Sequence, residues 1–183
     1  MKNLFNIGML VLVTTMFTSC QKIKSLFDVE LKSTLEGTLL IDVDEPAQKS
    51  TNGYDFYEEV TVDPLDDDDI DEYQDNIKKI KATKIVATIK DVNKADVVFE
   101  KGTKITVKGT NVVSWTLTEP WPIEIGDEIT LSDDDTVKLY KAVTEMLTEL
   151  QTLTIIAEGT CNQTGVYVTL VVGIDVVVTA SPL

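Results

Sequence analysis

The chain has 183 residues and a formal net charge of −15, with 31 acidic residues against 16 basic ones. All sixteen basic residues are lysines, and the sequence contains no histidine. The missing imidazole removes the commonest general base near neutral pH and the commonest zinc ligand, and the missing guanidinium removes the bidentate clamp for phosphates. Because the strong negative charge repels nucleic acid, a nucleic-acid partner is excluded.

Length and hydropathy favour one folded domain. Hydrophobic residues make up 43% of the chain, and many are Val or Ile, which is typical of a β-rich protein. We expect a short tether over residues 20–26 and a single domain over residues 27–183, large enough to bury a core without metal or disulfides. The apolar run over 166–178 is interrupted by Thr169, Gly173 and Asp175 at strand spacing, so it predicts a strand and not a membrane helix.

Alternation of apolar and polar residues predicts the strands. The two longest patterns cover 27–43 and 166–180, at the two ends of the domain. Shorter strands are predicted between them, over 54–62, 81–90, 97–100, 104–108, 112–118 and 152–157. We expect Lys101–Thr103 to join two of these strands in a hairpin. Pro120 and Pro122 bracket Trp121, which predicts an extended and unpaired segment.

Two segments that begin with acidic residues predict helices. In the first, Ile70, Tyr73, Ile77 and Ile80 recur at intervals of three and four residues. The aspartates before it cap the helix start, and the lysines at its end interact favourably with the helix dipole. The second helix is predicted over 132–151, and its buried stripe consists of Val137, Tyr140, Val143, Met146 or Leu147, and Leu150.

Eight to ten modest strands with two inserted helices predict a mainly β fold, an antiparallel two-sheet β-sandwich. The strand spacing resembles that of the immunoglobulin-like sandwiches of bacterial envelope lipoproteins. The Cys…Trp…Cys core of true immunoglobulin domains is absent, so the topology stays open. The alternative is an α+β fold, in which an antiparallel sheet carries the helices on one face.

The first twenty residues determine where we expect the protein to be located. Lys2 precedes an apolar run over 4–13 that is too short to span a bilayer, and small polar residues lead to Cys20. This segment resembles the lipobox signal peptide of bacterial lipoproteins, although Phe17 stands where that family usually has leucine. The resemblance implies that residues 1–19 are removed and that acylated Cys20 anchors the protein to a membrane of the cell envelope. The expected location is the outer membrane, facing the periplasm or the surface.

The second cysteine, Cys161, depends on this interpretation. If Cys20 is acylated, Cys161 has no disulfide partner in the chain, and we expect a partly buried structural thiol. The alternative is an ordinary secretory signal, in which case a disulfide between Cys20 and Cys161 becomes conceivable.

Three aspartates, Asp66, Asp68 and Asp69, are weak candidates for a calcium site, because hard cations prefer several carboxylate oxygens. Their spacing lacks the pattern and the glycine of an EF-hand loop. A solvated helix start explains them without a ligand, so we expect no metal and no cofactor.

Two tryptophans, Trp115 and Trp121, are candidate binding aromatics. Held on rigid segments, they would suit stacking on a glycan or packing against a protein partner. The alternative is that Trp121 folds back and plugs one end of the sandwich.

Three functional hypotheses follow. The first is a non-enzymatic, membrane-anchored lipoprotein that acts as a binding, adhesion or assembly module through its loops or sheet edges. The second is a carrier or sensor of an apolar ligand, with the helix over 133–151 closing a sheet cavity. The third is a glycoside hydrolase that uses carboxylates alone, since 31 acidic residues allow a suitable pair.

Overall fold

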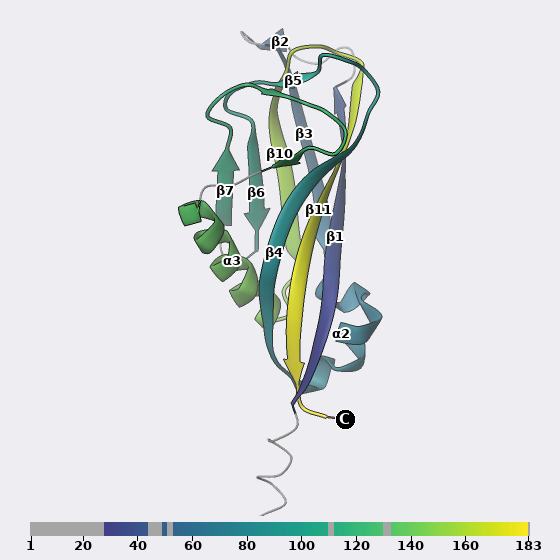
Figure 1. Cartoon of the computed structure of the whole chain (residues 1–183), viewed down its shortest axis with the longest axis vertical. Coiled ribbons are helices and arrows are strands. Elements are labelled where there is room, and N and C mark those ends of the chain that lie inside the picture. The colour runs from purple at the N-terminus through teal and green to yellow at the C-terminus, as the bar shows by residue number, and fades with distance from the viewer. Residues whose placement is uncertain (1–27, 44–48, 51–52, 110–111, 130–132, 183) are drawn as a thin grey trace, which may run out of the picture.

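The computed structural model describes residues 28–43, 49–50, 53–109, 112–129 and 133–182. These residues form two antiparallel sheets that pack face to face, with two α-helices beside them (Figure 1). The predicted mainly β sandwich is therefore confirmed.

Three long strands form most of the first sheet, which we name sheet A. Its order is β1 (Val29–Val43), β11 (Val166–Ala180), β4 (Ile77–Val92) and the short β9 (Glu128–Ile129). The strand β11 lies between β1 and β4 and pairs with β1 along its whole length. Both terminal alternating patterns of the sequence are thus neighbours in one sheet.

The second sheet, sheet B, is built around β10 (Leu153–Cys161). On one side β10 pairs with β3 (Gly53–Val62), which carries β2 (Lys49–Ser50). On the other side it pairs with two short strands in succession, β6 (Lys104–Lys108) and β5 (Val98–Phe99). The sheet is completed by β7 (Val112–Thr116) on β6 and β8 (Trp121–Pro122) on β5.

Two predictions for this sheet are wrong. The hairpin across Lys101–Thr103 is not formed, because β5 and β6 both pair with β10 instead of with each other. The segment around Trp121 is not unpaired, because Trp121 and Pro122 pair with Phe99 and Val98. A proline is tolerated in so short a strand, where few ladder hydrogen bonds are needed.

The first predicted helix is much shorter than expected. It is α2 (Asp68–Glu72), preceded by a 3₁₀ turn over Pro64–Asp66 and followed by another over Gln74–Asn76. The prediction that the helix continues through Ile80 is wrong, since the chain enters β4 at Ile77. Pairing with β11 along the following Ile-, Val- and Thr-rich residues outweighs the helical spacing of the isoleucines.

The second predicted helix is α3 (Asp133–Thr148). Val143, Met146 and Leu147 are buried as expected. The prediction that Val137 belongs to the buried stripe is wrong, because its side chain is 68% exposed while Leu139 is buried instead. The stripe is rotated because the helix packs along the edge of β4 and beside β7, and not flat on a sheet face.

The core fills the space between the two sheets. Every second residue of β11 from Val166 to Ala180 is buried, as are the inward residues of β1 from Leu35 to Val43. Gly37 of β1 is needed for this packing. A Cβ there would lie 2.8 Å from Val62 Cγ2 and 3.0 Å from Val60 Cγ1, so only glycine lets β1 approach β3 this closely.

Candidate functional site

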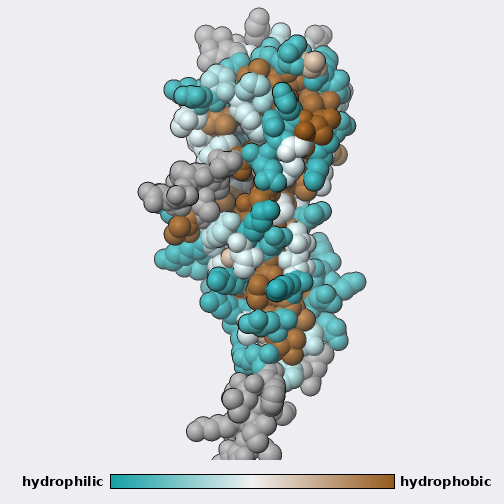
Figure 2. Space-filling view, in the orientation of Figure 1, coloured by the Kyte–Doolittle hydropathy of each residue, from teal (hydrophilic) through white to brown (hydrophobic). Residues whose placement is uncertain are grey.

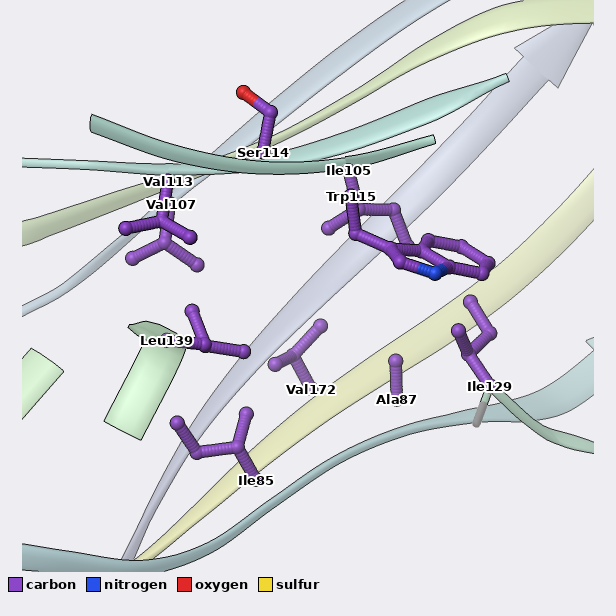
Figure 3. A pocket seen from close by; sticks show the side chains of 10 residues that line it. All are labelled: Ile85, Ala87, Ile105, Val107, Val113, Ser114, Trp115, Ile129, Leu139 and Val172. Atoms are coloured by element: carbon purple, nitrogen blue, oxygen red, sulfur yellow. The ribbon is translucent and has the colours of Figure 1, made fainter. Parts of the chain in front are cut away.

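An apolar cavity of about 50 Å³ lies between the sheets, on the side where β4 and β7 face each other. Sheet A contributes Ile85, Ala87, Ile129 and Val172, sheet B contributes Ile105, Val107, Val113 and Trp115, and α3 contributes Leu139 (Figure 3). The remaining lining residue is Ser114, whose side chain points away from the cavity in Figure 3. Its hydroxyl lies 3.0 Å from the Thr106 hydroxyl. The side chains that face the cavity are therefore all apolar.

Hydroxyl groups of α3 close the lower part of the β4 edge. The backbone N–H of Ile85 donates to the Tyr140 hydroxyl at 3.2 Å, and that of Ala82 donates to Thr144 Oγ1 at 3.1 Å. Thr148 Oγ1 accepts from the N–H of the next inward residue, Ile80, at 3.3 Å. The spacing of four residues places the three hydroxyls on one helix face, so α3 satisfies strand groups that would otherwise need a neighbouring strand.

The upper part of the same edge is covered by β9, which pairs with Ala87 and Thr88. Leu139 from α3 and Ile129 from β9 therefore border the cavity on either side. The cavity exists because a helix and a short strand share this edge and leave an incompletely filled space between them.

Across the cavity, β7 forms the edge of sheet B. In the part of the chain that the structure describes, β7 pairs only with β6. Val113 and Trp115 face the cavity, whereas Val112, Ser114 and Thr116 are exposed. Val112 is 62% exposed, as is Val137 of α3 at 68%. The cavity is thus bordered by the edge strand β7, and two exposed apolar side chains lie on β7 and α3.

The two candidate tryptophans occupy different places. Trp115 is half-buried and lines the cavity. Trp121 is half-buried at the end of the core, where its ring meets Phe99 edge-on with centroids 6.4 Å apart. Phe99 in turn packs against Phe56 at 4.9 Å. Trp121 therefore helps to close one end of the sandwich. Both indoles border a small internal space of about 10 Å³, so they come together inside the sandwich and not as an exposed platform.

The aspartates before α2 act as caps. Asp63 Oδ1 accepts from the N–H of Leu65 at 2.9 Å, and Asp67 Oδ1 accepts from the N–H of Ile70 at 3.0 Å. The Ser33 hydroxyl donates to the other oxygen of Asp67. The calcium candidates Asp66, Asp68 and Asp69 are exposed, and no three potential metal ligands gather among the described residues.

Cys161 is fully buried at the end of β10. Burial raises the pKa of its thiol above the ordinary value, although hydrogen bonds from the backbone of Gln163 and Asn162 act in the opposite direction. Among the described residues it is a free cysteine. Cys20 lies outside the described residues.

The carboxyl group of Glu58 on β3 has a raised pKa. Burial raises the pKa of Glu58 on β3, and the negative charge of Asp42 on β1 adds to the effect. Both residues lie on the β1–β3 side of the sandwich, whereas the cavity is bounded by β4 and β7.

The cavity could be only partly foreseen from the sequence. Trp115 was singled out for its aromatic ring, but Val113, Ile129 and Leu139 were not. The alternation of β7 signals which of its residues face inward, yet nothing local in the sequence tells which strand lies opposite.

None of the helices in the described ranges is both long enough and apolar enough to cross a membrane. Comparison with known proteins found no matching protein family, no matching curated protein and no matching solved structure.

Proposed function

We propose that the chain is a lipid-anchored protein of the bacterial cell envelope whose sandwich holds a protein partner without catalysing a reaction. The proposal for the anchor is supported by the lipobox-like residues that lead to Cys20. The proposal for the binding role is supported by one structural observation, the apolar cavity bordered by the edge strand β7.

An edge strand beside an apolar cavity suits the addition of an extended segment. A strand that pairs with β7 would gain backbone hydrogen bonds along the edge. Every second side chain of that strand would point to the face on which Val113 and Trp115 line the cavity. An apolar side chain at one of these positions would then fill the cavity, while the exposed Val112 and Val137 offer further apolar contact.

The size of the cavity favours a side chain over a free lipid. Its 50 Å³ is a third of the roughly 150 Å³ of an apolar protein cavity known to hold benzene. The end of one aliphatic side chain fits this space, whereas an acyl chain needs far more. The dry lining agrees with a carrier of apolar ligands, but the volume supports the peptide-binding module.

The binding proposal is tested with displayed random peptides selected on the folded protein. We expect the selected peptides to share one Leu, Ile or Val and to protect the β7 amides from hydrogen exchange. The variant Val113→Phe, which fills the cavity, should weaken their binding at least tenfold, because the anchor side chain loses its place. The control Val112→Thr changes the exposed side of the same strand and should keep the binding.

If the peptides bind Val113→Phe as tightly as the unaltered protein, the cavity does not receive their anchor side chain, and this part of the proposal is wrong. If no peptide binds, but a fluorescent fatty acid binds and is lost in Val113→Phe, the carrier becomes the better account.

A further inference from the structure

The outer face of sheet A has an almost uncharged centre. From Thr169 to Thr179, the outward residues of β11 are Thr, Val, Gly, Asp, Val and Thr, so that Asp175 is their one charged member. The exposed face of an antiparallel sheet is normally polar along every strand. Figure 2 views this face, and hydrophobic and neutral surface runs along the molecule between hydrophilic groups.

The two strands that flank β11 carry opposite charges. On β4, Lys79, Lys81 and Lys84 pair with successive outward residues of β11. On β1, the outward residues that pair with Thr179 and Gly173 are Glu30 and Glu36, with Lys32 between them. In the described part of the chain neither Lys84 nor Glu36 forms an ion pair.

The middle of this face is hollowed at Gly173. A groove of about 160 Å³ lies there, bounded by Glu36 on one side and by Lys84, Lys90 and Glu128 on the other. An added Cβ at Gly173 would meet only Thr34 Cγ2, at 3.9 Å. Glycine is therefore not required for the packing of the chain itself at this position, and its absent side chain leaves the hollow open.

We propose that this face binds a second copy of the same chain. A twofold axis parallel to the strands would place β4 of one copy over β1 of the other, so that Lys79 lies over Glu30 and Lys84 near Glu36, while Lys81 lies over Lys32. Lys84 of each copy would then lie over the region of Glu36 in the other. Asp175 lies on the central strand β11, where its Oδ1 accepts from the Thr34 hydroxyl of β1 at 2.8 Å, so this axis brings it near Asp175 of the other copy, with Lys84 beside each. The alternative axis, across the strands, would oppose lysines to lysines.

The available area agrees with a specific but modest interface. Three strands about 4.8 Å apart and paired over some 40 Å present roughly 600 Å² per copy. Two copies would bury about 1,200 Å², at the lower end of stable interfaces, with a mostly uncharged centre and a charged rim. Because the axis follows the strands, both copies would direct their N-terminal ends the same way, as two chains on one membrane must.

The proposal is tested by oxidative crosslinking of the full chain in its membrane. In Gly173→Cys the new thiol lies near the axis, and we expect a disulfide-linked product of twice the chain mass. The control Thr116→Cys places an exposed thiol on sheet B and should give several-fold less product. Thermal unfolding of both variants checks that each remains folded.

Charge reversal in the Gly173→Cys background tests the orientation. Lys84→Glu and Glu36→Lys should each reduce the crosslinked product several-fold, and the two changes together should restore most of it. The proposal is overturned by product no greater than in the Thr116→Cys control, by a crosslinked product of another mass, or by failure of the double reversal to restore. Since Gly173, Lys84 and Glu36 all lie outside β7, this outcome is independent of the peptide experiment.

Discussion

Gly37 and Gly173 lie in neighbouring strands of sheet A, yet they serve opposite purposes. Gly37 faces inward, where Val60 and Val62 leave no room for a side chain. Gly173 faces outward into a groove that a side chain would fill. In the sequence both are glycines within an alternating pattern, and only the neighbours across the sandwich distinguish a packing requirement from an open surface.

Cys161 provides a prediction at the same scale. Its pKa is raised by burial, so the folded state holds the proton after the unfolded state, with a pKa near 8.5, has released it. The free energy of unfolding is therefore unaffected by this group below about pH 8.5 and falls as pH rises toward the folded pKa, by at most about 1.4 kcal/mol per pH unit.

Urea unfolding followed by tryptophan fluorescence at several pH values measures this effect. The control is Cys161→Ala, which should be less stable at neutral pH because of the lost burial but should lack the additional alkaline decline. Parallel pH profiles for the two proteins would show that the buried thiol does not titrate as described.

At the scale of elements, alternating residues predicted the long strands well. The patterns of β1, β3 and β11 match their observed bounds closely, because each strand has one face in the core, whereas β10 continues to Cys161, beyond the predicted end at residue 157. The helix prediction through Ile80 failed, since isoleucines at helical spacing also fit a strand once a long partner strand is available. Local alternation does not show which strands pair with each other. For this reason the hairpin prediction was wrong and the cavity was not predicted.

The contact between α3 and β4 also depends on partners. Thr144 and Thr148 carry no signal of their own in an amphipathic helix, yet both bind backbone groups of β4. The Thr148 hydroxyl also lies 2.9 Å from the carbonyl oxygen of Ile80. These hydroxyls replace a neighbouring strand along part of the sheet edge.

Substitution of these hydroxyls should destabilise the fold without changing side-chain volume. We expect Thr148→Val to lower the free energy of unfolding by about 1–3 kcal/mol, because an edge N–H loses its acceptor. Urea denaturation measures the change, and Thr116→Val on the exposed side of β7 is the matched control, with an expected change within about 0.5 kcal/mol. A Thr148→Val protein as stable as its control would mean that α3 does not seal this edge.

For the molecule as a whole, the features that bear on function lie on two different surfaces. The cavity and the β7 edge occupy one side of the sandwich, and the groove at Gly173 lies on the outer face of sheet A. A partner strand and a second copy could therefore bind together. The composition predicts an acidic surface, but the separation of lysines on β4 from acids on β1 emerges only from the strand order.

The central claim is that Cys20 holds this sandwich on a membrane, because location decides which partners it meets. The most direct measurement is the intact mass of the membrane-extracted protein, compared with Cys20→Ala. The account predicts a mature chain that begins at Cys20 and carries acyl groups, and it predicts the loss of both in the variant. If the protein is soluble and carries no acyl groups, with or without Cys20, the anchor is contradicted and the interpretation returns to a secreted domain.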